Sequence, residues 1–469
     1  MKEYEVVVGL ECHVQLLTQS KLFSPAKNQY GDEPNVNVDA LDIALPGTLP
    51  VLNQKAVEFA VRLGLALGCE INTTSVFARK HYFYPDLPKG YQISQYDKPI
   101  CGPGQLTFQT SEGPKTIGIE RIHIEEDAGK NIHVEGGNSS YVDYNRAGTP
   151  LLEIVTRPDI RSAEEAMEAY RALRALVTYL GICDGNLQEG SMRADANVSI
   201  RPKGSTEFGT RTETKNLNSI KFLGQAVEFE SRRQALELKA GHAIRQETRL
   251  WDSNRKESRA LRSKEEAHDY RYFADPDLLP LILADGYVDE IDKNLPELPW
   301  QKQSRYQSEL GLSAYDAGVL IVEKKIADYF ESALRLHSHA KSVANWIINE
   351  MQLEPRITPS QLAELVRLID EKAISGTIAK TIYEELIAHP EQSAEQIVDA
   401  KGLRMQRDTN QIQKLIEAIC EQHPSEIQKY RSGKTQIFGF FVGQVMKQTQ
   451  GKADPTLSSE LLKKYLDRP

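Results

Sequence analysis

The sequence predicts an α+β protein whose strands and helices occupy different parts of the chain. Up to about residue 293, short alternating and β-branched runs recur between a few helical stretches. Beyond the proline-containing segment 294–299 (N-L-P-E-L-P), almost every pattern has helical spacing. A chain of 469 residues is also too long for one hydrophobic core. We therefore predict a mixed N-terminal domain over 1–293, a helical domain over 294–404 and a helical tail domain over 405–469.

Composition narrows the class of protein. Apolar content of 40% and charged content of 26% are typical of a soluble globular protein. No run of 18 apolar residues is present to span a membrane, and the first residues lack the apolar region of a signal peptide. The five cysteines are scattered without a C-x-x-C pair, which favours the reducing cytoplasm over a disulfide framework or a cysteine zinc site.

Charge is unevenly distributed along the chain. The net charge of −9 argues by itself against a nucleic-acid partner. Residues 401–469, however, carry 12 Lys and Arg against seven Asp and Glu, which gives +5 and leaves −14 for the first 400 residues. A basic tail can contact phosphates while the acidic body holds cations. A tail that is basic only for solubility explains the charge equally well.

The first predicted strand covers residues 4–16 (Y-E-V-V-V-G-L-E-C-H-V-Q-L), which alternate and are β-branched. Glu11 and His13 are two residues apart, so their side chains project from the same face. A carboxylate beside an imidazole makes half of a divalent-metal site. A Glu–His hydrogen bond on a solvated face is the alternative.

The segment 79–99 combines aromatic residues, prolines and cations after a loop-rich stretch (24–50) and a predicted core helix (56–68). We expect it to form neither helix nor strand. At Lys89-Gly90 the backbone can approach an anion closely. Aromatic rings with interleaved cations suit a nucleotide or a tRNA acceptor end. The alternative is a rigid loop packed on its own rings.

An acidic triplet, residues 125–127, follows the strand predicted over residues 117–124. Alternation places Glu126 on the same face as Ile122 and Ile124, with Glu125 beside it. A carboxylate on an apolar face is costly unless a positive charge meets it. A bound cation or an Arg or Lys side chain would supply that charge, and a solvated acidic turn is the alternative.

Two further strands carry charged residues. Glu153 lies in the middle of the apolar strand predicted over 151–156, where it too needs a compensating charge. The strand predicted over 188–202 places Arg193 and Asp195 on one face. Six acidic or imidazole side chains lie on or beside short strands. Each is weak evidence by itself, but together they indicate a divalent cation and phosphate chemistry. They are Glu11, His13, Glu125, Glu126, Glu153 and Asp195.

Helices are predicted after residues 156 and 218 and throughout the C-terminal third. Ser162 is a good N-cap for the first, with two glutamates in its first turn. Neither a Walker nor a Rossmann glycine motif is present, so any ATP is bound by another fold. The predicted helices cover 162–180, 219–240, 313–337, 341–351, 359–371, 376–388, 408–421, 426–432, 435–448 and 460–467.

Six long motifs, in order, resemble one family. They are G-L-E-C-H-V-Q-L, Y-F-Y-P-D-L-P-K-G-Y-Q-I-S-Q, H-I-E-E-D-A-G-K, D-Y-N-R-A-G-T-P-L-L-E-I-V, E-G-S-M-R-A-D-A-N-V-S-I-R-P and D-Y-R-Y-F-A-D-P-D. The chain resembles, over essentially its whole length, the B subunit of the glutamyl/aspartyl-tRNA amidotransferases (GatB of the GatCAB complex). The resemblance implies a cradle domain on an antiparallel sheet, a helical domain and a YqeY-type tail that touches the tRNA.

The resemblance also implies an activity. Such proteins use ATP and Mg²⁺ to phosphorylate the side-chain carboxylate of Glu-tRNA(Gln) or Asp-tRNA(Asn), and then transfer ammonia onto the acyl phosphate. An amidase partner, the A subunit, supplies the ammonia from glutamine through a tunnel, and the small C subunit clamps the heterotrimer together. The sequence does not distinguish between the two tRNA substrates.

The family's metal positions fall on Glu11, His13, Glu126 with Glu125 as the neighbouring candidate, and Glu153. Lys89 is then expected to contact phosphate, and Arg193 and Asp195 to complete the pocket. Many members hold a structural zinc with C-x-C and C-x-x-C pairs, but here residues 24–26 and 39–42 contain no cysteine. We therefore expect no zinc, and a loop held by packing instead.

Two other readings compete with an ATP-dependent amidotransferase subunit. A tRNA-binding adaptor would leave the chemistry to a partner, but a binder does not need strand-borne carboxylates. An unrelated magnesium-dependent kinase would need its own acceptor pocket and would not need a basic helical tail.

Overall fold

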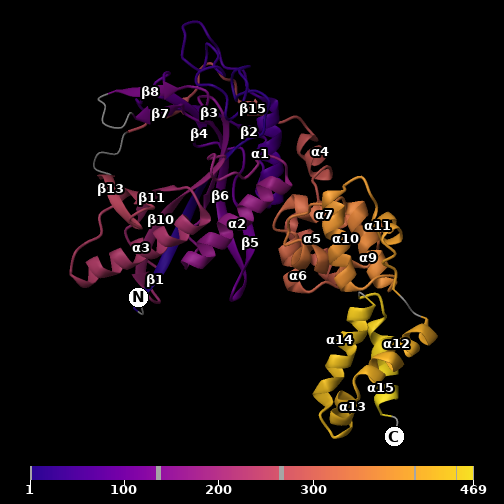
Figure 1. The fold of residues 1–469 in the computed structure, drawn as a ribbon. Helices are drawn as coiled ribbons and strands as arrows, with labels where there is room; N and C mark the ends of the chain where they lie inside the picture. Colours follow the sequence, from indigo (N-terminus) through magenta and orange to yellow (C-terminus); the bar gives the residue numbers. More distant parts are fainter. Residues whose placement is uncertain (1–2, 134–138, 264–268, 406–407, 450, 468–469) are drawn as a thin grey trace. The chain divides into compact units, whose positions relative to one another are not determined.

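The structure is a computed structural model that describes residues 3–133, 139–263, 269–405, 408–449 and 451–467. It divides into two compact units, 1–299 and 300–469. Strands occur in the first unit, and the described part of the second is helical (Figure 1). The α+β class is confirmed. The two predicted domain boundaries stay predictions, although the described residues do form three separate apolar clusters.

An eight-stranded sheet is the frame of the N-terminal unit. Its order is β13-β12-β11-β10-β1-β9-β6-β5, and every neighbouring pair is antiparallel except β11 with β12, which is parallel. The expected antiparallel sheet is therefore mixed at one pair. The strands are β1 (Tyr4–Gln15), β5 (Gly104–Thr110), β6 (Gly113–Glu126), β9 (Pro150–Thr156), β10 (Met192–Pro202), β11 (Thr212–Leu217), β12 (Glu247–Asp252) and β13 (Glu257–Ser263).

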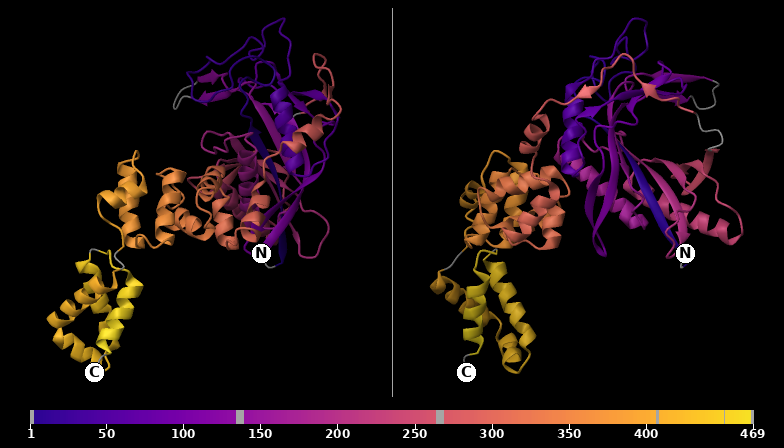
Figure 2. Two further views of the ribbon diagram at one scale, coloured as in Figure 1. Left: turned by 90° about the vertical axis from the view of Figure 1, so that its right-hand side faces the viewer. Right: turned by 180° about the vertical axis from the view of Figure 1, so that it is seen from behind.

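One face of this sheet is apolar and covered by helices. Even-numbered side chains such as Leu10, Ile124 and Ile154 are fully buried. They belong to the same core as residues of α2 (Ala163–Tyr179) and α3 (Ile220–Lys239), which lie against each other (Figure 1, Figure 2). Beyond the register shift between Ile119 and Arg121 of β6, the odd-numbered side chains of β6 project from the opposite face. Alternation along β1, β9 and this part of β6 therefore places their charged side chains on that face.

Local sequence determines the starts of α2 and α3. Ser162 accepts a hydrogen bond from the Glu165 backbone N–H, and Ser219 does the same for Phe222. Inside α3, Glu230 is fully buried and accepts hydrogen bonds from Thr212 and Arg233. These two partners satisfy a charge that would otherwise be costly to bury.

The segment 79–99 corrects the prediction that it is neither helix nor strand. It contains most of a hairpin, with β3 (Phe77–His81) paired to β4 (Tyr91–Gln95) and β14 (Phe273–Ala274) added at the edge. The partner strand β14 lies almost 200 residues away, so local composition could not reveal it. Smaller pairs are β2 (Thr74–Ser75) with β15 (Leu281–Ile282) and β7 (Lys130–His133) with β8 (Ser140–Asp143).

Other elements differ in their ends. The strand predicted over 188–202 begins only at Met192, because Asn186 and the left-handed Gly190 form a turn before it. The helix predicted over 313–337 breaks at residues 321–323, and the last helix begins at Pro455, five residues early, with Asp454 as its N-cap. Further helices are α1 (Gln54–Ala66) and α4 (Tyr287–Lys293) in the first unit.

In the second unit the helices pack around their own apolar clusters. Three short helices have no counterpart among the predictions. They are α4 of the first unit and the helices over 299–308 and 394–400. The helices of this unit are α5 (Pro299–Ser308), α6 (Ala314–Leu320), α7 (Lys324–Leu334), α8 (Ala340–Asn345), the π-helix Trp346–Glu350, α9 (Pro359–Asp370), α10 (Gly376–Ala388), α11 (Ala394–Ala400), α12 (Thr409–Gln422), α13 (Pro424–Arg431), the 3-10 turn Thr435–Ile437, α14 (Phe438–Gln448) and α15 (Pro455–Leu466). None of the described helices has the length and hydrophobicity needed to cross a membrane.

Candidate active site

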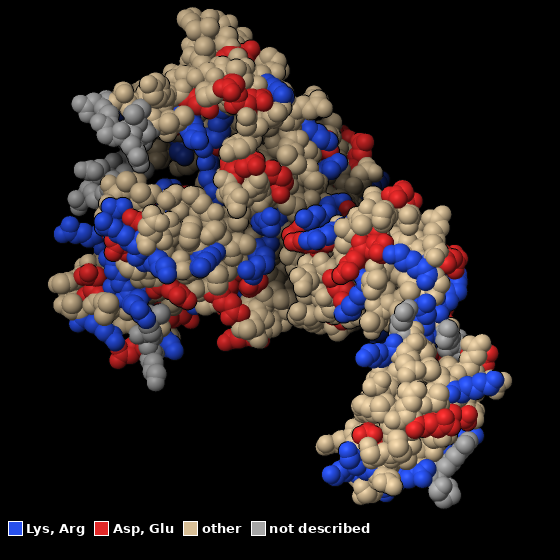
Figure 3. Space-filling view, in the orientation of Figure 1, with Lys and Arg blue, Asp and Glu red and all other residues tan. Residues whose placement is uncertain are grey.

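The strand order places four charged side chains in one row across the sheet. In the register, Arg193 of β10 is opposite His13 of β1, His13 is opposite Glu153 of β9, and Glu153 is opposite His123 of β6. All four are odd-numbered and so project from the polar face. Figure 3 shows a recess in the N-terminal unit with Lys and Arg side chains on its inner wall.

Glu125, two residues along β6 from His123, brings a second carboxylate to the two imidazoles and Glu153 of this row. His13 Nε2 lies 3.5 Å from Glu153 Oε2 and 3.8 Å from Glu125 Oε1. His123 Nε2 lies 3.4 Å and 3.6 Å from the Oε2 atoms of Glu153 and Glu125. Glu125 also accepts a hydrogen bond from the Ser94 hydroxyl, at 3.1 Å. One ligand atom each from His13, Glu125 and Glu153 falls within 4.8 Å of the others, which is the arrangement that a single metal ion needs.

The buried groups shift one another's protonation. Burial by itself lowers the pKa of His123, but the charge of Glu153 and the hydrogen bond with Glu125 raise it to about 9. Burial raises the pKa of Glu153, and the two imidazoles then lower it well below its ordinary value. Positive charge on His123 thus offsets the carboxylates here, which is the compensation that a buried carboxylate requires.

Glu11 lies in a second acidic group one step along β1. One oxygen each from Glu11, Asp195 and Glu213 lies within 4.8 Å of the others. Lys215 Nζ is 2.7 Å from both Asp195 Oδ2 and Glu213 Oε1, and Asn197 donates to Glu11 at 2.9 Å. Burial, together with the charges of Glu153 and Glu213, raises the pKa of Glu11. The sequence analysis placed Glu11 beside His13 in one metal site. In the structure Glu11 lies instead with Asp195 and Glu213, in a group separate from that of His13.

Glu126 points away from both groups. Its carboxylate is paired with the Lys89 ammonium and accepts a hydrogen bond from the Ile93 backbone N–H, at 2.9 Å. The sequence placed Glu126 on the apolar side, and the side chain is indeed buried there with a cation as its partner. The structure therefore separates the neighbouring carboxylates, because Glu125 joins His13 and Glu153 while Glu126 joins Lys89.

Comparison with known proteins gives the family. Residues 6–289 match the family described as GatB/GatE catalytic domain, and residues 328–466 match the GatB domain. The chain is 51% identical to the B subunit of the aspartyl/glutamyl-tRNA(Asn/Gln) amidotransferase of Geotalea daltonii, with 99% of each chain covered. The same subunit of Geobacter sulfurreducens is also 51% identical over 99% of each chain, and that of Nitratidesulfovibrio vulgaris is 50% identical over 98% of this chain and 99% of the relative.

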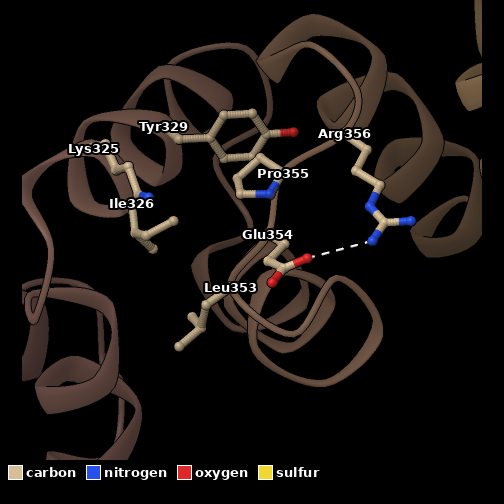
Figure 4. A pocket seen from close by; sticks show the side chains of 7 residues that line it. All are labelled: Lys325, Ile326, Tyr329, Leu353, Glu354, Pro355 and Arg356. Atoms are coloured by element: carbon tan, nitrogen blue, oxygen red, sulfur yellow. Dashed lines mark hydrogen bonds and ion pairs between the residues drawn. The ribbon is translucent and has the colours of Figure 1, made fainter.

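This chain belongs to the GatB family of amidotransferase subunits. The resemblance carried by the six motifs is confirmed over the full span that they suggested. The row of Arg193, His13, Glu153 and His123 lies inside the matched catalytic domain. A second hollow, a pocket of about 600 Å³ around Tyr329 and Arg356, lies in the helical unit and contains none of the predicted site residues (Figure 4).

Several buried charged residues of the site were missed in the sequence. His123 could have been found, because it alternates with Glu125 along β6. Asp127 follows the last residue of β6, and nothing in the sequence indicated that its role differs from that of the two preceding glutamates. In the structure it accepts a hydrogen bond from Arg193 at 3.0 Å and lies 3.6 Å from Arg146. Lys80 gave no local signal. Burial by itself lowers the pKa of Lys80, but the charges of Glu125 and nearby groups raise it above the ordinary value.

The donor set of this GatB chain fits a divalent cation. His13, Glu125 and Glu153 offer one imidazole nitrogen and two carboxylates, and the Nδ1 atoms of His13 and His123 are buried without a hydrogen-bond partner among the described residues. Carboxylates suit Mg²⁺, whereas an imidazole ligand is also compatible with Mn²⁺. A cation bound here would replace the imidazolium charge that now balances the two glutamates.

The first loop of the chain is held by more than packing. Lys21 and Asp42 are buried and form an ion pair with Nζ 2.9 Å from Oδ2. The same oxygen accepts hydrogen bonds from the Ser24 hydroxyl at 3.2 Å and the Asp39 backbone N–H at 2.9 Å. Residues 24–26 and 39–42, which contain no cysteine, are thus joined by a buried charge pair.

Proposed function

We propose that this chain is the catalytic B subunit of an amidotransferase that converts Glu-tRNA(Gln), Asp-tRNA(Asn) or both into the amidated forms. The observation that carries the proposal is the convergence of His13, Glu125 and Glu153 on the polar face of one sheet. The first step joins a side-chain carboxylate oxygen to the γ-phosphorus of ATP and releases ADP. Ammonia then attacks the acyl carbon, phosphate leaves, and the amide forms.

In this proposal His13, Glu125 and Glu153 hold Mg²⁺. When bound, the cation would offset the negative charge that develops on the transferring phosphoryl group. The chain's own contribution is to fix the three ligands on neighbouring strands, where the sheet register holds them within reach of one another. Arg193, which is ion-paired with Asp127, lies next to His13 on the neighbouring strand β10.

Lys89 is the proposed phosphate contact. Its side chain is only 8% exposed and its ammonium is paired with Glu126, so an arriving phosphate would compete with that carboxylate. Arg193 and Asp195 are proposed to line the nucleotide side of the recess. Replacing the Glu126 carboxylate by a phosphate keeps the buried Lys89 ammonium paired, which costs less free energy than leaving it without a partner.

The proposal includes two partner proteins and a tRNA. The relatives are named as B subunits, which supports a complex with an amidase that makes ammonia, the A subunit, and with the small C subunit. The helical tail is proposed to contact the tRNA body through its basic side chains.

ADP release by the purified complex tests the proposal. The assay contains Glu-tRNA(Gln), Mg²⁺ and ATP but no ammonia donor. Glu125→Gln is expected to reduce ADP release at least about 100-fold, because it removes a charged ligand rather than an outer-shell group. Glu120→Gln is the matched control, because Glu120 lies on the same strand and is ion-paired with Arg157 but half exposed. Glutaminase activity of the partner should persist in both variants.

Equal ADP release by Glu125→Gln and Glu120→Gln would contradict the assignment of the phosphorylation step to this chain. That result would favour the adaptor reading, in which the chain only positions the tRNA.

A further inference from the structure

Two histidines and one aspartate converge in the helical unit, far along the chain from the candidate active site. His337 follows α7, His339 is the residue before α8, and Asp370 is the last residue of α9. Their side chains are 18%, 58% and 21% exposed, so the group lies at the surface and is open to ions in solution. Neither the proposed transamidation nor the sequence motifs use any of the three.

The contacts among them are close. His337 Nε2 and His339 Nδ1 both lie 2.7 Å from Asp370 Oδ2. The Ser342 hydroxyl donates to the other oxygen, Oδ1, at 2.9 Å, and also lies 3.0 Å from His339 Nδ1. One ligand atom from each of the three residues falls within 4.8 Å of the others. The carboxylate is therefore held in place while two ring nitrogens face one of its oxygens.

We propose that His337, His339 and Asp370 form a surface site for a borderline divalent metal ion, with Zn²⁺ as the best fit. Two imidazoles and one carboxylate are ligands that Zn²⁺, Co²⁺ and Ni²⁺ accept readily, whereas Mg²⁺ and Ca²⁺ prefer oxygen alone. Water would complete the coordination. Ser342 holds the carboxylate from the outside, as the neighbours of metal ligands commonly do.

The geometry needs only a small adjustment. Zn²⁺ binds nitrogen and oxygen at about 2.0 to 2.2 Å, so tetrahedral ligands stand about 3.4 Å apart. The present nitrogen–oxygen separations are 2.7 Å. An opening of about 0.7 Å, which side-chain rotation can supply, admits the ion. The hydrogens that now lie between each nitrogen and Asp370 must leave those nitrogens, because the imidazole binds metal through a lone pair.

Two helix ends favour a cation at this position. Asp370 ends α9, and the His337 backbone N–H donates to the Ala333 carbonyl near the end of α7. The C-terminal end of a helix carries partial negative charge. A bound ion would tie together α7, α8 and α9, which otherwise meet through the apolar cluster of the helical unit.

The test is a Zn²⁺ titration of the full-length chain in its complex, after chelator treatment and with millimolar Mg²⁺ present to occupy oxygen-rich sites. Wild type is expected to bind one more equivalent of Zn²⁺ than His339→Ala. The substitution should reduce the affinity of this site for Zn²⁺ at least 100-fold. His242→Ala is the matched control, because His242 Nδ1 lies 2.8 Å from Glu237 but no second histidine among the described residues joins the pair. It should keep the wild-type stoichiometry.

A second variant protects the test against misfolding. Ser342→Ala removes only the outer contact and should weaken the same Zn²⁺ equivalent about 10-fold to 100-fold. Zn²⁺ should also raise the melting temperature of wild type more than that of His339→Ala, because binding to the folded state alone stabilises it. The same Zn²⁺ stoichiometry and affinity in wild type and His339→Ala would overturn the proposal and leave a hydrogen-bonded cluster only.

Discussion

The buried pair of Lys21 and Asp42 gives a stability prediction that can be worked out from the structure. Lys21→Met replaces the lysine with a side chain of similar length that has no charge. The Lys21 side chain is fully buried and that of Asp42 is 3% exposed, so water cannot replace the lost partner. Removing one member of a buried ion pair typically costs about 3 to 5 kcal/mol of unfolding free energy.

The lower end of that range is expected here. Asp42 Oδ2 keeps two donors after the substitution, the Ser24 hydroxyl and the Asp39 backbone N–H. Methionine also retains most of the packing contacts of the lysine stem. The expected loss is therefore about 3 kcal/mol. With a urea m-value of about 3 kcal/mol/M for a unit of this size, the unfolding midpoint should fall by about 1 M.

The assay is urea unfolding followed by the fluorescence of Trp251. That residue is buried in the N-terminal unit, whereas Trp300 and Trp346 belong to the other unit and are replaced by phenylalanine in all samples. Following one tryptophan restricts the measurement to one unit, since the whole chain need not unfold in one step.

Lys27→Met is the matched control. Lys27 lies in the same loop region, 3.6 Å from Asp32, but its side chain is 57% exposed, so the pair contributes little. The unfolding free energy of Lys27→Met should differ from that of wild type by no more than about 0.5 kcal/mol. A Lys21→Met midpoint as close to wild type as that of Lys27→Met would refute the claim that the ion pair holds this loop.

Two other predictions concern a buried carboxylate and the tail. Burial raises the pKa of Glu230, but hydrogen bonds from Arg233, Gln234 and Thr212 lower it below the ordinary 4.5. The ionised Glu230 carboxylate therefore stabilises the folded state above pH 4.5, and this stabilisation is lost as the pH falls through the folded-state pKa. Urea midpoints measured from pH 6 to pH 3 should fall more steeply for wild type than for Glu230→Gln, and parallel curves would be evidence against this reading. Deleting residues 406–469 should weaken tRNA binding and reduce its salt dependence while ADP release at saturating tRNA persists; unchanged affinity with lost ADP release would show that the tail was misread.

The sequence was sufficient for elements whose signals are local. Alternation placed Glu11 with His13 and Arg193 with Asp195 on common faces, and the N-caps Ser162 and Ser219 begin their helices where helix starts were predicted. The α+β division along the chain also followed from local periodicity, because strand and helix patterns have different repeats.

Only the tertiary structure decided how the faces combine. The order β10-β1-β9-β6 sets His13 beside Glu153 and Glu153 beside His123, although β1 lies more than 100 positions from β9 in the chain. It also separated Glu125 from Glu126, and paired the latter with Lys89. In β1, β9 and β10, which were predicted as strands, sequence alone determined which side chains share a face. Strand pairing depends on register and packing between distant segments, and that is why the site's composition required the fold.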